Sequence, residues 1–170
     1  MLTLVVGGAR CGKSALAERM AAAVGGPVTY VATGTAGDDD DMAARIDAHR
    51  RQRPAAWSTL EPAPGELVEA VSGAAGTLLL DSLSTWLAVA PGFAVDVAGL
   101  CSALAARAGE SFVVSDEVGM GVHPSSASGR QFRDALGVAN QAVGAVADEV
   151  LLVVAGHALS LGGRPREATP

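Results

Sequence analysis

Short apolar runs separated by longer helix-forming stretches recur along the whole chain. Runs of four to six apolar residues bounded by turn residues are typical of strands that are buried on both faces. The runs predict strands at residues 2–6, 28–32, 77–81, 112–115 and 150–154, the last being the final strand. A weaker strand is predicted at residues 56–60.

Helical patterns fill the intervals between these strands. They cover residues 13–24, 38–53, 65–71, 82–89, 95–107 and 130–147. Gly25-Gly26-Pro27 ends the first helix and Pro54 ends the second. Residues 118–129 are predicted to be a loop, and the tail from residue 162 is predicted to fray. The alternation of strands and helices predicts an α/β fold with a mostly parallel sheet and helices on both faces.

Length and composition narrow the class of protein. The 170 residues, 49% of them hydrophobic, suit a single domain spanning residues 1–170. A net charge of −6 argues against a nucleic-acid surface, which needs a basic face. The two cysteines do not form a disulfide framework and suit the reducing cytoplasm. No apolar stretch approaches the roughly 20 residues of a membrane span, and the N-terminal run is too short for a signal peptide.

The only lysine of the chain, Lys13, lies in a full match to the phosphate-binding pattern G-x-x-x-x-G-K-[ST]. The matching residues are Gly7, Gly8, Ala9, Arg10, Cys11, Gly12, Lys13 and Ser14. A predicted strand precedes them and a predicted helix follows, which is the order that this motif requires. We therefore predict a P-loop NTPase domain.

The chemistry of this loop is that of a nucleotide with Mg²⁺. Backbone N–H groups of the glycines and the N-terminus of the following helix favour an anion. The Lys13 ammonium can reach the β and γ phosphates, and the Ser14 hydroxyl can ligate Mg²⁺. The alternative is a glycine-rich turn between a core strand and a helix.

Two acidic positions at strand ends can serve the same site. Asp81 ends one predicted strand and is the simpler candidate for the metal shell; its alternative is to cap the helix that begins at Ser82. The pair Asp116-Glu117 ends another strand. For Glu117 we leave open water positioning, general base catalysis, substrate contact and a solvated loop acid.

A second group of candidates follows the strand at 28–32. The loop Thr33-Gly34-Thr35 is expected to lie beside the phosphate-binding loop, because ligands bind at the carboxyl edge of such sheets. In the next helix Arg45, His49 and Arg53 share one face, with Arg50 and Arg51 beside them. A neutral imidazole among arginines suits reaction with a phosphate, but an exposed basic helix face explains the same spacing.

The remaining histidines and the tryptophans carry less information. His123 and His157 are predicted to lie in loops without metal-ligand spacing. Trp57 and Trp86 are predicted to be core or interface anchors. The acidic run at residues 38–41 is predicted to be a solvated helix start.

The ordered set of motifs closely resembles the bifunctional adenosylcobinamide kinase/adenosylcobinamide-phosphate guanylyltransferase family. The resemblance spans nearly the whole chain. It rests on the phosphate-binding loop, residues 30–33, residues 40–46 with His49-Arg50, Arg53-Pro54, Trp57, Glu61, residues 80–83, residues 117–121, residues 132–134, Asn140-Gln141 and residues 147–150. The segment between residues 86 and 95 is shorter than the family pattern, and the C-terminal end diverges from it.

The resemblance implies a RecA-like P-loop fold, a homotrimer and a role late in cobalamin synthesis. It implies phosphorylation of adenosylcobinamide, then transfer of GMP from GTP to adenosylcobinamide phosphate through a covalent intermediate on His49. Nucleotide contacts carried over by motif position fall on residues 7–14, Thr33, Gly34, Thr35, Arg50, Arg51, Gln52, Arg53, Glu61 and Asp81. Glu61 is implied by the resemblance alone.

Two rival functions stay open at the level of sequence. Another P-loop small-molecule kinase would transfer the γ phosphate without using His49. A nucleotide-dependent switch or assembly module would hydrolyse slowly and change its partner binding. The sequence leaves open whether ATP or GTP serves the kinase step.

Overall fold

A computed structural model describes residues 1–34 and 54–163 of the protein. The described strands form one seven-stranded sheet in the order β3-β2-β4-β5-β1-β6-β7. All neighbouring pairs are parallel except β6 and β7, which are antiparallel. The strands are β1 Leu2–Gly7, β2 Val28–Ala32, β3 Ser58–Leu60, β4 Thr77–Asp81, β5 Ser111–Asp116, β6 Glu149–Val154 and β7 His157–Gly162.

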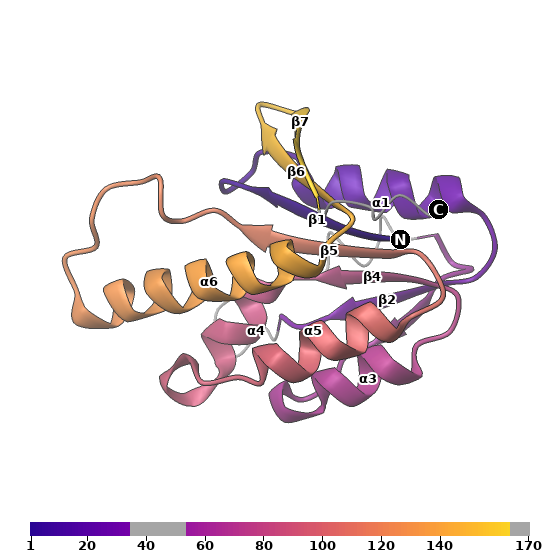
Figure 1. The fold of residues 1–170 in the computed structure, drawn as a ribbon, viewed down its shortest axis with the longest axis horizontal. Coiled ribbons are helices and arrows are strands. Elements are labelled where there is room, and N and C mark those ends of the chain that lie inside the picture. Colours follow the sequence, from indigo (N-terminus) through magenta and orange to yellow (C-terminus); the bar gives the residue numbers. More distant parts are fainter. Residues whose placement is uncertain (35–53, 164–170) are drawn as a thin grey trace, which may run out of the picture.

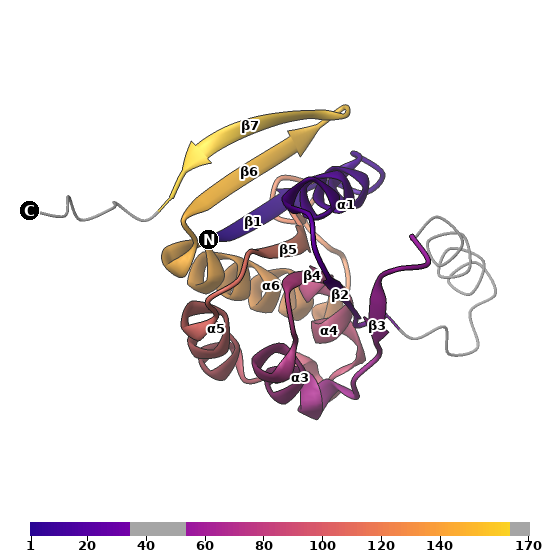
Figure 2. The ribbon, with the colours of Figure 1, turned by 90° about the vertical axis from the view of Figure 1, so that its right-hand side faces the viewer.

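Helices cover both faces of this sheet, as the alternation of elements predicts (Figures 1 and 2). Helix α1 (Lys13–Val24) lies on one face. The other face carries α3 (Leu67–Gly73), α4 (Leu83–Val89), α5 (Val97–Ala106) and α6 (Ala127–Val146). Short 3₁₀ turns at Pro64–Glu66 and Pro91–Phe93 precede α3 and follow α4. The predicted α/β class and its mostly parallel sheet are confirmed.

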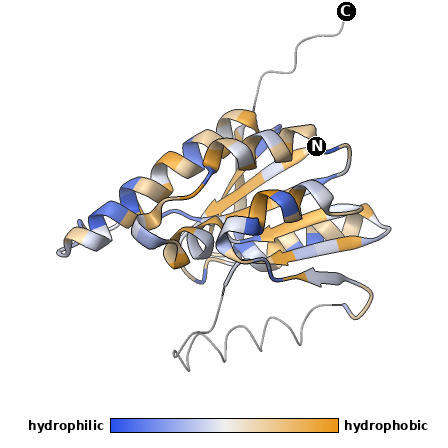
Figure 3. Cartoon of the chain, turned by 90° about the horizontal axis from the view of Figure 1, so that it is seen from below, coloured by the Kyte–Doolittle hydropathy of each residue, from blue (hydrophilic) through white to orange (hydrophobic). Residues whose placement is uncertain are grey.

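The sheet separates two hydrophobic cores. The larger core lies between the sheet and the four-helix face and includes Leu80, Trp86 and Leu136. The smaller core lies under α1, where Tyr30 and Phe112 are buried and Trp57 packs at the margin. Figure 3 shows that the strands consist mostly of hydrophobic residues, whereas the helices mix hydrophobic and hydrophilic residues. This double burial explains why the central strands are continuous apolar runs.

Three expectations about local structure were wrong. The strand at 149–154 is not the last, because β7 pairs back onto it through a turn in which Ala155 and Gly156 both have positive φ. His157 therefore begins a strand instead of lying in a loop. Helix α6 begins at Ala127, within the expected loop, because the Ser126 hydroxyl accepts a hydrogen bond from the Gly129 N–H and caps it. The predicted helix at 38–53 lies outside the described residues.

Arg107 joins the end of α3 to the strands that follow it. Its Nη1 donates to the carbonyls of Val71 and Ala74 at 2.9 and 2.6 Å, and its Nη2 donates to the Gly76 carbonyl at 2.8 Å. Its Nε donates to the Ser111 hydroxyl at 3.1 Å. Burial lowers the pKa of Arg107 from its ordinary value, so these acceptors offset a desolvation cost.

Removal of the Arg107 guanidinium should destabilise the folded protein. We expect Arg107→Met to lower the free energy of unfolding by about 3 kcal/mol, because three carbonyls lose a charged donor at once. Urea denaturation measures the change. Arg19→Met, at an exposed position of α1, is the matched control and should stay within about 0.5 kcal/mol. Equal losses in the two variants would contradict the assignment.

None of the helices in the described part of the chain is long and apolar enough to cross a membrane.

Candidate active site

Polar residues follow the strands at one edge of the sheet. Because β1, β2, β4, β5 and β6 are parallel, their carboxyl ends meet at this edge. The register pairs Gly7 with Asp116 across β1 and β5, and Ala32 with Asp81 across β2 and β4. The phosphate-binding loop and both acidic candidates therefore share one edge of the fold, where ligands bind in open α/β sheets.

The loop between β1 and α1 has the backbone form that its glycines allow. Gly12, at the cap of α1, has a φ of 96°, and Arg10 has a φ of 57°. The Cys11 N–H donates to the Gly8 carbonyl, and the Leu16 N–H donates to the Gly12 carbonyl at 3.0 Å. Gly12 has no side chain to cap α1, and the first N–H groups of a helix without such a cap suit an anion.

The β6–β7 turn supports this loop from the side opposite β5. The Gly156 N–H donates to the Cys11 carbonyl at 2.9 Å. A Cβ on Gly7 would lie 2.5 Å from the Val153 carbonyl oxygen and 2.6 Å from the Cys11 sulfur. Gly7 is therefore required by close packing, and the loop is held between two neighbouring strands.

A methyl group at Gly7 should displace the loop. We expect Gly7→Ala to lower the free energy of unfolding by about 2–4 kcal/mol, because a backbone oxygen cannot move aside as a side chain can. Thermal and urea denaturation measure this change. Gly8→Ala is the matched stability control, since a Cβ there would meet no atom within 4 Å. Similar destabilisation by both substitutions would show that the contact with β6 is not the cause.

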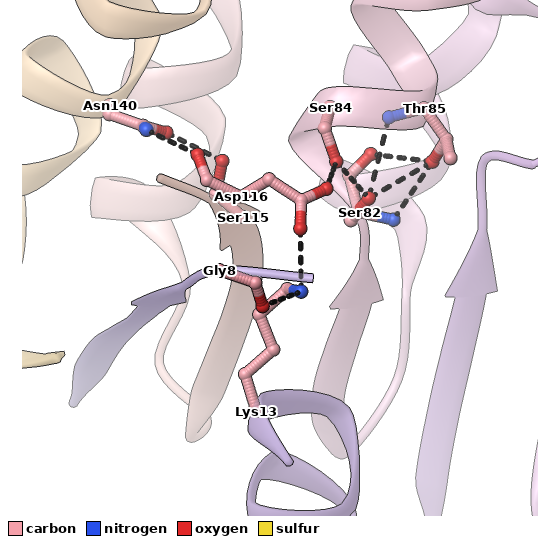
Figure 4. A network of polar contacts seen from close by, with 8 residues as sticks. All are labelled: Gly8, Lys13, Ser82, Ser84, Thr85, Ser115, Asp116 and Asn140. Atoms are coloured by element: carbon pink, nitrogen blue, oxygen red, sulfur yellow. Dashed lines mark hydrogen bonds and ion pairs between the residues drawn. The ribbon is translucent and has the colours of Figure 1, made fainter. Parts of the chain in front are cut away.

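Lys13 and Asp116 form an ion pair at the centre of the site (Figure 4). The Lys13 Nζ lies 2.5 Å from Asp116 Oδ1 and 3.2 Å from the Gly8 carbonyl oxygen. The second carboxylate oxygen of Asp116 accepts a hydrogen bond from the Ser84 hydroxyl at the start of α4. The lysine of the phosphate-binding motif thus lies beside the end of β5, the strand that neighbours β1.

Asn140 of α6 fixes the end of β5. Its Nδ2 donates to the Asp116 carbonyl at 3.0 Å, and its Oδ1 accepts from the Ser115 hydroxyl at 2.6 Å. One amide therefore holds two consecutive residues of β5, and Figure 4 shows it on the side of Asp116 away from Ser84. Asp116 is anchored through both its backbone and its side chain.

Asp81 is oriented by a buried tyrosine. The Tyr30 hydroxyl donates to Asp81 Oδ2 at 2.8 Å, while the ring of Tyr30 is buried under α1. The helix after Asp81 is capped by Ser82, whose hydroxyl accepts from the Thr85 N–H, so Asp81 does not serve as that cap. Asp81 is half-buried at the carboxyl edge, where a carboxylate is a ligand type that suits a hard cation.

Hydroxyl groups join the ends of β2 and β4. The Thr33 hydroxyl donates to the Ser82 carbonyl at 2.6 Å and lies 2.5 Å from the Thr85 hydroxyl. Ser82 in turn bonds to Ser84 at 2.8 Å, which extends the chain of hydroxyls to Asp116. The network connects three strand ends and holds their polar groups in fixed positions relative to one another.

The expectation that Thr33 lies directly beside the phosphate-binding loop was wrong. Thr33 and Gly34 follow β2 at the same edge, but β4 and β5 stand between β2 and β1. Gly34 lies near the Thr85 side chain instead. Glu61 follows β3 at an exposed position, with β2, β4 and β5 between it and β1. The other predicted contacts, Thr35, His49, Arg50, Arg51, Gln52 and Arg53, lie outside the described residues.

Sequence reasoning missed Tyr30, Ser84, Thr85 and Asn140 as site residues. The cluster Ser82-Leu83-Ser84-Thr85 directly after Asp81 was a usable signal, because three hydroxyls in one helical turn at a strand end cannot all serve as a cap. Asn140 is among the positions that carry the family resemblance, but its place within α6, 24 residues from Asp116, gave no sign that it contacts the end of β5.

Known proteins resemble the chain over nearly its full length. The protein from Pseudomonas aeruginosa named bifunctional adenosylcobalamin biosynthesis protein CobP is 38% identical over 173 residues, covering 97% of this chain and 99% of that protein. Its counterpart CobU from Escherichia coli is 36% identical over 179 residues, with 92% and 97% covered. CobU from Salmonella typhimurium is 37% identical over the same length, with the same shares.

The fold also has a solved neighbour. Flagellar accessory protein FlaH from Methanocaldococcus jannaschii superposes with a TM-score of 0.53 at 17% identity, covering 96% of this chain and 78% of that one. Identity this low supports the RecA-like P-loop fold alone. The decisive match is to a family model described as cobinamide kinase / cobinamide phosphate guanyltransferase, which covers residues 3–161. The chain belongs to this family of bifunctional nucleotide-using enzymes.

Proposed function

We propose that the protein phosphorylates adenosylcobinamide and then transfers GMP from GTP to adenosylcobinamide phosphate, giving adenosyl-GDP-cobinamide in cobalamin biosynthesis. The single observation that supports this most is the match of residues 3–161 to one family of such enzymes. The phosphate-binding loop, with Lys13 and two acidic strand ends at the same edge, supplies chemistry suited to both steps.

In the kinase step the substrate hydroxyl attacks the γ phosphorus, and the bond to the β-phosphate oxygen breaks. The hydroxyl proton leaves with the diphosphate or solvent. The Lys13 ammonium and the N–H groups at the start of α1 stabilise the charge that spreads over the phosphoryl oxygens. The phosphate-binding residues Gly7, Gly8, Ala9, Arg10, Cys11, Gly12, Lys13 and Ser14 hold the nucleotide in this proposal.

In the transfer step an imidazole nitrogen of His49 attacks the α phosphorus in line as pyrophosphate departs. The resulting P–N bond is then broken by a phosphate oxygen of adenosylcobinamide phosphate, which restores the imidazole. Arg50, Arg51, Gln52 and Arg53 follow His49 in sequence and supply charge or hydrogen bonds for the phosphates. Thr33, Gly34, Thr35, Glu61 and Asp81 complete the proposed contacts, with Thr33 and Gly34 on the β2–β4 side.

Mg²⁺ is the proposed metal, and the described residues fit it. No group of three or more His, Cys, Asp or Glu side chains in residues 1–34 and 54–163 could hold a metal by itself. That suits Mg²⁺, which binds through one or two protein oxygens together with nucleotide phosphates and water. Ser14 and Asp81 would hold the ion, which neutralises phosphate charge when bound. Tyr30 orients the Asp81 carboxylate for this role.

We also propose a homotrimer of single-domain subunits in the cytoplasm. The edge strand β7 exposes Leu159 and Leu161, at 61% and 58%, and Val154 of β6 is 61% exposed. Exposed apolar side chains on a sheet edge favour burial against another subunit. Size-exclusion chromatography with light scattering tests the trimer.

A product assay tests the proposed function. Purified protein is incubated with adenosylcobinamide, Mg²⁺ and either ATP or GTP, and the corrinoids are separated and identified by mass spectrometry. We expect adenosylcobinamide phosphate to form with each triphosphate that serves the kinase step. We expect adenosyl-GDP-cobinamide to form only where GTP is present. Phosphorylated product without any GMP conjugate would favour the kinase alone. Nucleotide hydrolysis without a modified corrinoid would favour a switch or assembly module.

A further inference from the structure

We propose that Asp116 competes with the β and γ phosphates for the Lys13 ammonium and thereby sets the affinity of the site for nucleoside triphosphates. This inference rests on the nucleotide site proposed above. The motif assigns Lys13 to those phosphates, yet its ammonium is bound by Asp116 at 2.5 Å and by the Gly8 carbonyl at 3.2 Å. An ammonium has three donors and these acceptors occupy two of them, so a nucleotide that places both a β and a γ oxygen on Lys13 has to share or displace one acceptor.

The ion pair between Lys13 and Asp116 is partly buried, which strengthens its electrostatic interaction. The Lys13 side chain is only 12% exposed and that of Asp116 only 29% exposed. Solvent therefore screens the pair less than it screens a surface pair, and the short contact is a charge-assisted hydrogen bond. Releasing Lys13 from Asp116 costs part of the binding free energy of the triphosphate.

Asp116 is held so that it cannot follow the ammonium. The Asp116 carboxylate accepts a hydrogen bond from the Ser84 hydroxyl, and the Asp116 carbonyl accepts one from the Asn140 side chain. Asp116 is also paired with Gly7 in the register of β5 and β1. The carboxylate consequently stays beside the phosphate-binding loop (Figure 4). A fixed negative charge at this place also repels the terminal phosphates of a nucleotide.

The number of phosphates on the nucleotide distinguishes this competition from other effects of Asp116. Only the β and γ phosphates compete for Lys13, so the effect of Asp116 should be large for triphosphates and small for monophosphates. A general effect of net charge would instead scale with any anion. The comparison of ATP or GTP with AMP or GMP therefore separates a local competition from a long-range field.

Isothermal titration calorimetry on Asp116→Asn tests the proposal. We expect ATP and GTP to bind about tenfold tighter to the variant, both in EDTA and with Mg²⁺, and AMP and GMP to change less than about twofold. Asp96→Asn is the matched control, because it removes the same charge and keeps the cap of α5, where Asp96 accepts from the Gly99 N–H. The control should bind as the parent does.

A second measurement examines the ion pair itself. Because Lys13 is the only lysine, protein labelled with ¹³C at lysine Cε gives one side-chain resonance. Asp116→Asn should shift this resonance, and so should ATP added to the parent. A resonance that Asp116→Asn leaves unmoved would show that the pair does not form in solution and would overturn the proposal.

The calorimetric outcomes also discriminate. Unchanged or weaker triphosphate binding by Asp116→Asn in EDTA overturns the competition. Weaker binding only with Mg²⁺ overturns it too, because Asp116 would then act as a metal ligand. Tighter binding by Asp96→Asn would assign the effect to net charge. A folded parent that binds no triphosphate would refute the nucleotide site itself, which is a separate failure.

Discussion

Lys13→Ala should lower the kcat of adenosylcobinamide phosphorylation about 10³-fold, an effect comparable to the loss of a charged group that stabilises a transition state. Its ammonium lies at the centre of the site, between the Gly8 carbonyl and Asp116. The charge developing on the transferred phosphoryl group has no other lysine to meet it. Steady-state assays of phosphorylated corrinoid, with ATP and with GTP, measure the loss.

Guanylyl transfer should fall in the same variant, because GTP binds through the same loop. Lys13→Arg should restore little, since a planar guanidinium cannot replace a compact ammonium where the lysine side chain is only 12% exposed. Arg19→Ala removes a cation from an exposed position of the same helix and should leave both activities within about twofold. Full kinase activity in folded Lys13→Ala would refute the role of the phosphate-binding loop.

The sequence predicted the elements of the sheet well because each central strand is buried on both faces. The predicted strand 77–81 coincides with β4, and the P-loop residues run from the last residue of β1 to the first turn of α1, as expected. A strand buried on both faces needs apolar residues at consecutive positions, and such a run is visible in a single sequence. The family resemblance added the reaction, which no hydrophobic pattern contains.

Strand β7 escaped prediction for a local reason. Ser160 separates the two leucines of His157–Gly162 and every residue of the strand is exposed, so it lacks the continuous apolar run that marks the central strands. Its connecting turn places Ala155 at a φ of 51°, a conformation that alanine rarely adopts. Neither the strand nor its turn therefore carries the usual sequence signal of a hairpin.

Strand order explains the errors in the site. The chain does not lay its strands side by side in sequence: β5 lies next to β1, whereas β2 is separated from β1 by β4 and β5. Asp116 consequently meets Lys13, and Thr33 meets Ser82 and Thr85 instead of the phosphate-binding loop. A strand-end residue can be assigned to the carboxyl edge from sequence, but its neighbours there depend on topology.

His49→Ala should abolish transfer of GMP, with a loss of about 10⁴-fold or more, while phosphorylation of adenosylcobinamide persists. Removal of a covalent nucleophile eliminates the intermediate, whereas γ-phosphoryl transfer depends on Lys13. GTP labelled in the α phosphate, incubated with Mg²⁺ and the protein, measures the intermediate as acid-labile, alkali-stable label on the chain. We expect label on the parent and none on His49→Ala.

The chain offers matched controls for this experiment, because it has two other histidines. His123→Ala and His157→Ala, both at exposed positions, should retain the label and both activities. Label that survives in His49→Ala and disappears in either of the others would place the nucleophile elsewhere. Parent protein that makes adenosyl-GDP-cobinamide without ever carrying label would instead require direct attack of the corrinoid phosphate on GTP. Since an in-line displacement inverts phosphorus, a chiral α-thiophosphate of GTP separates these routes: two displacements retain configuration and one inverts it.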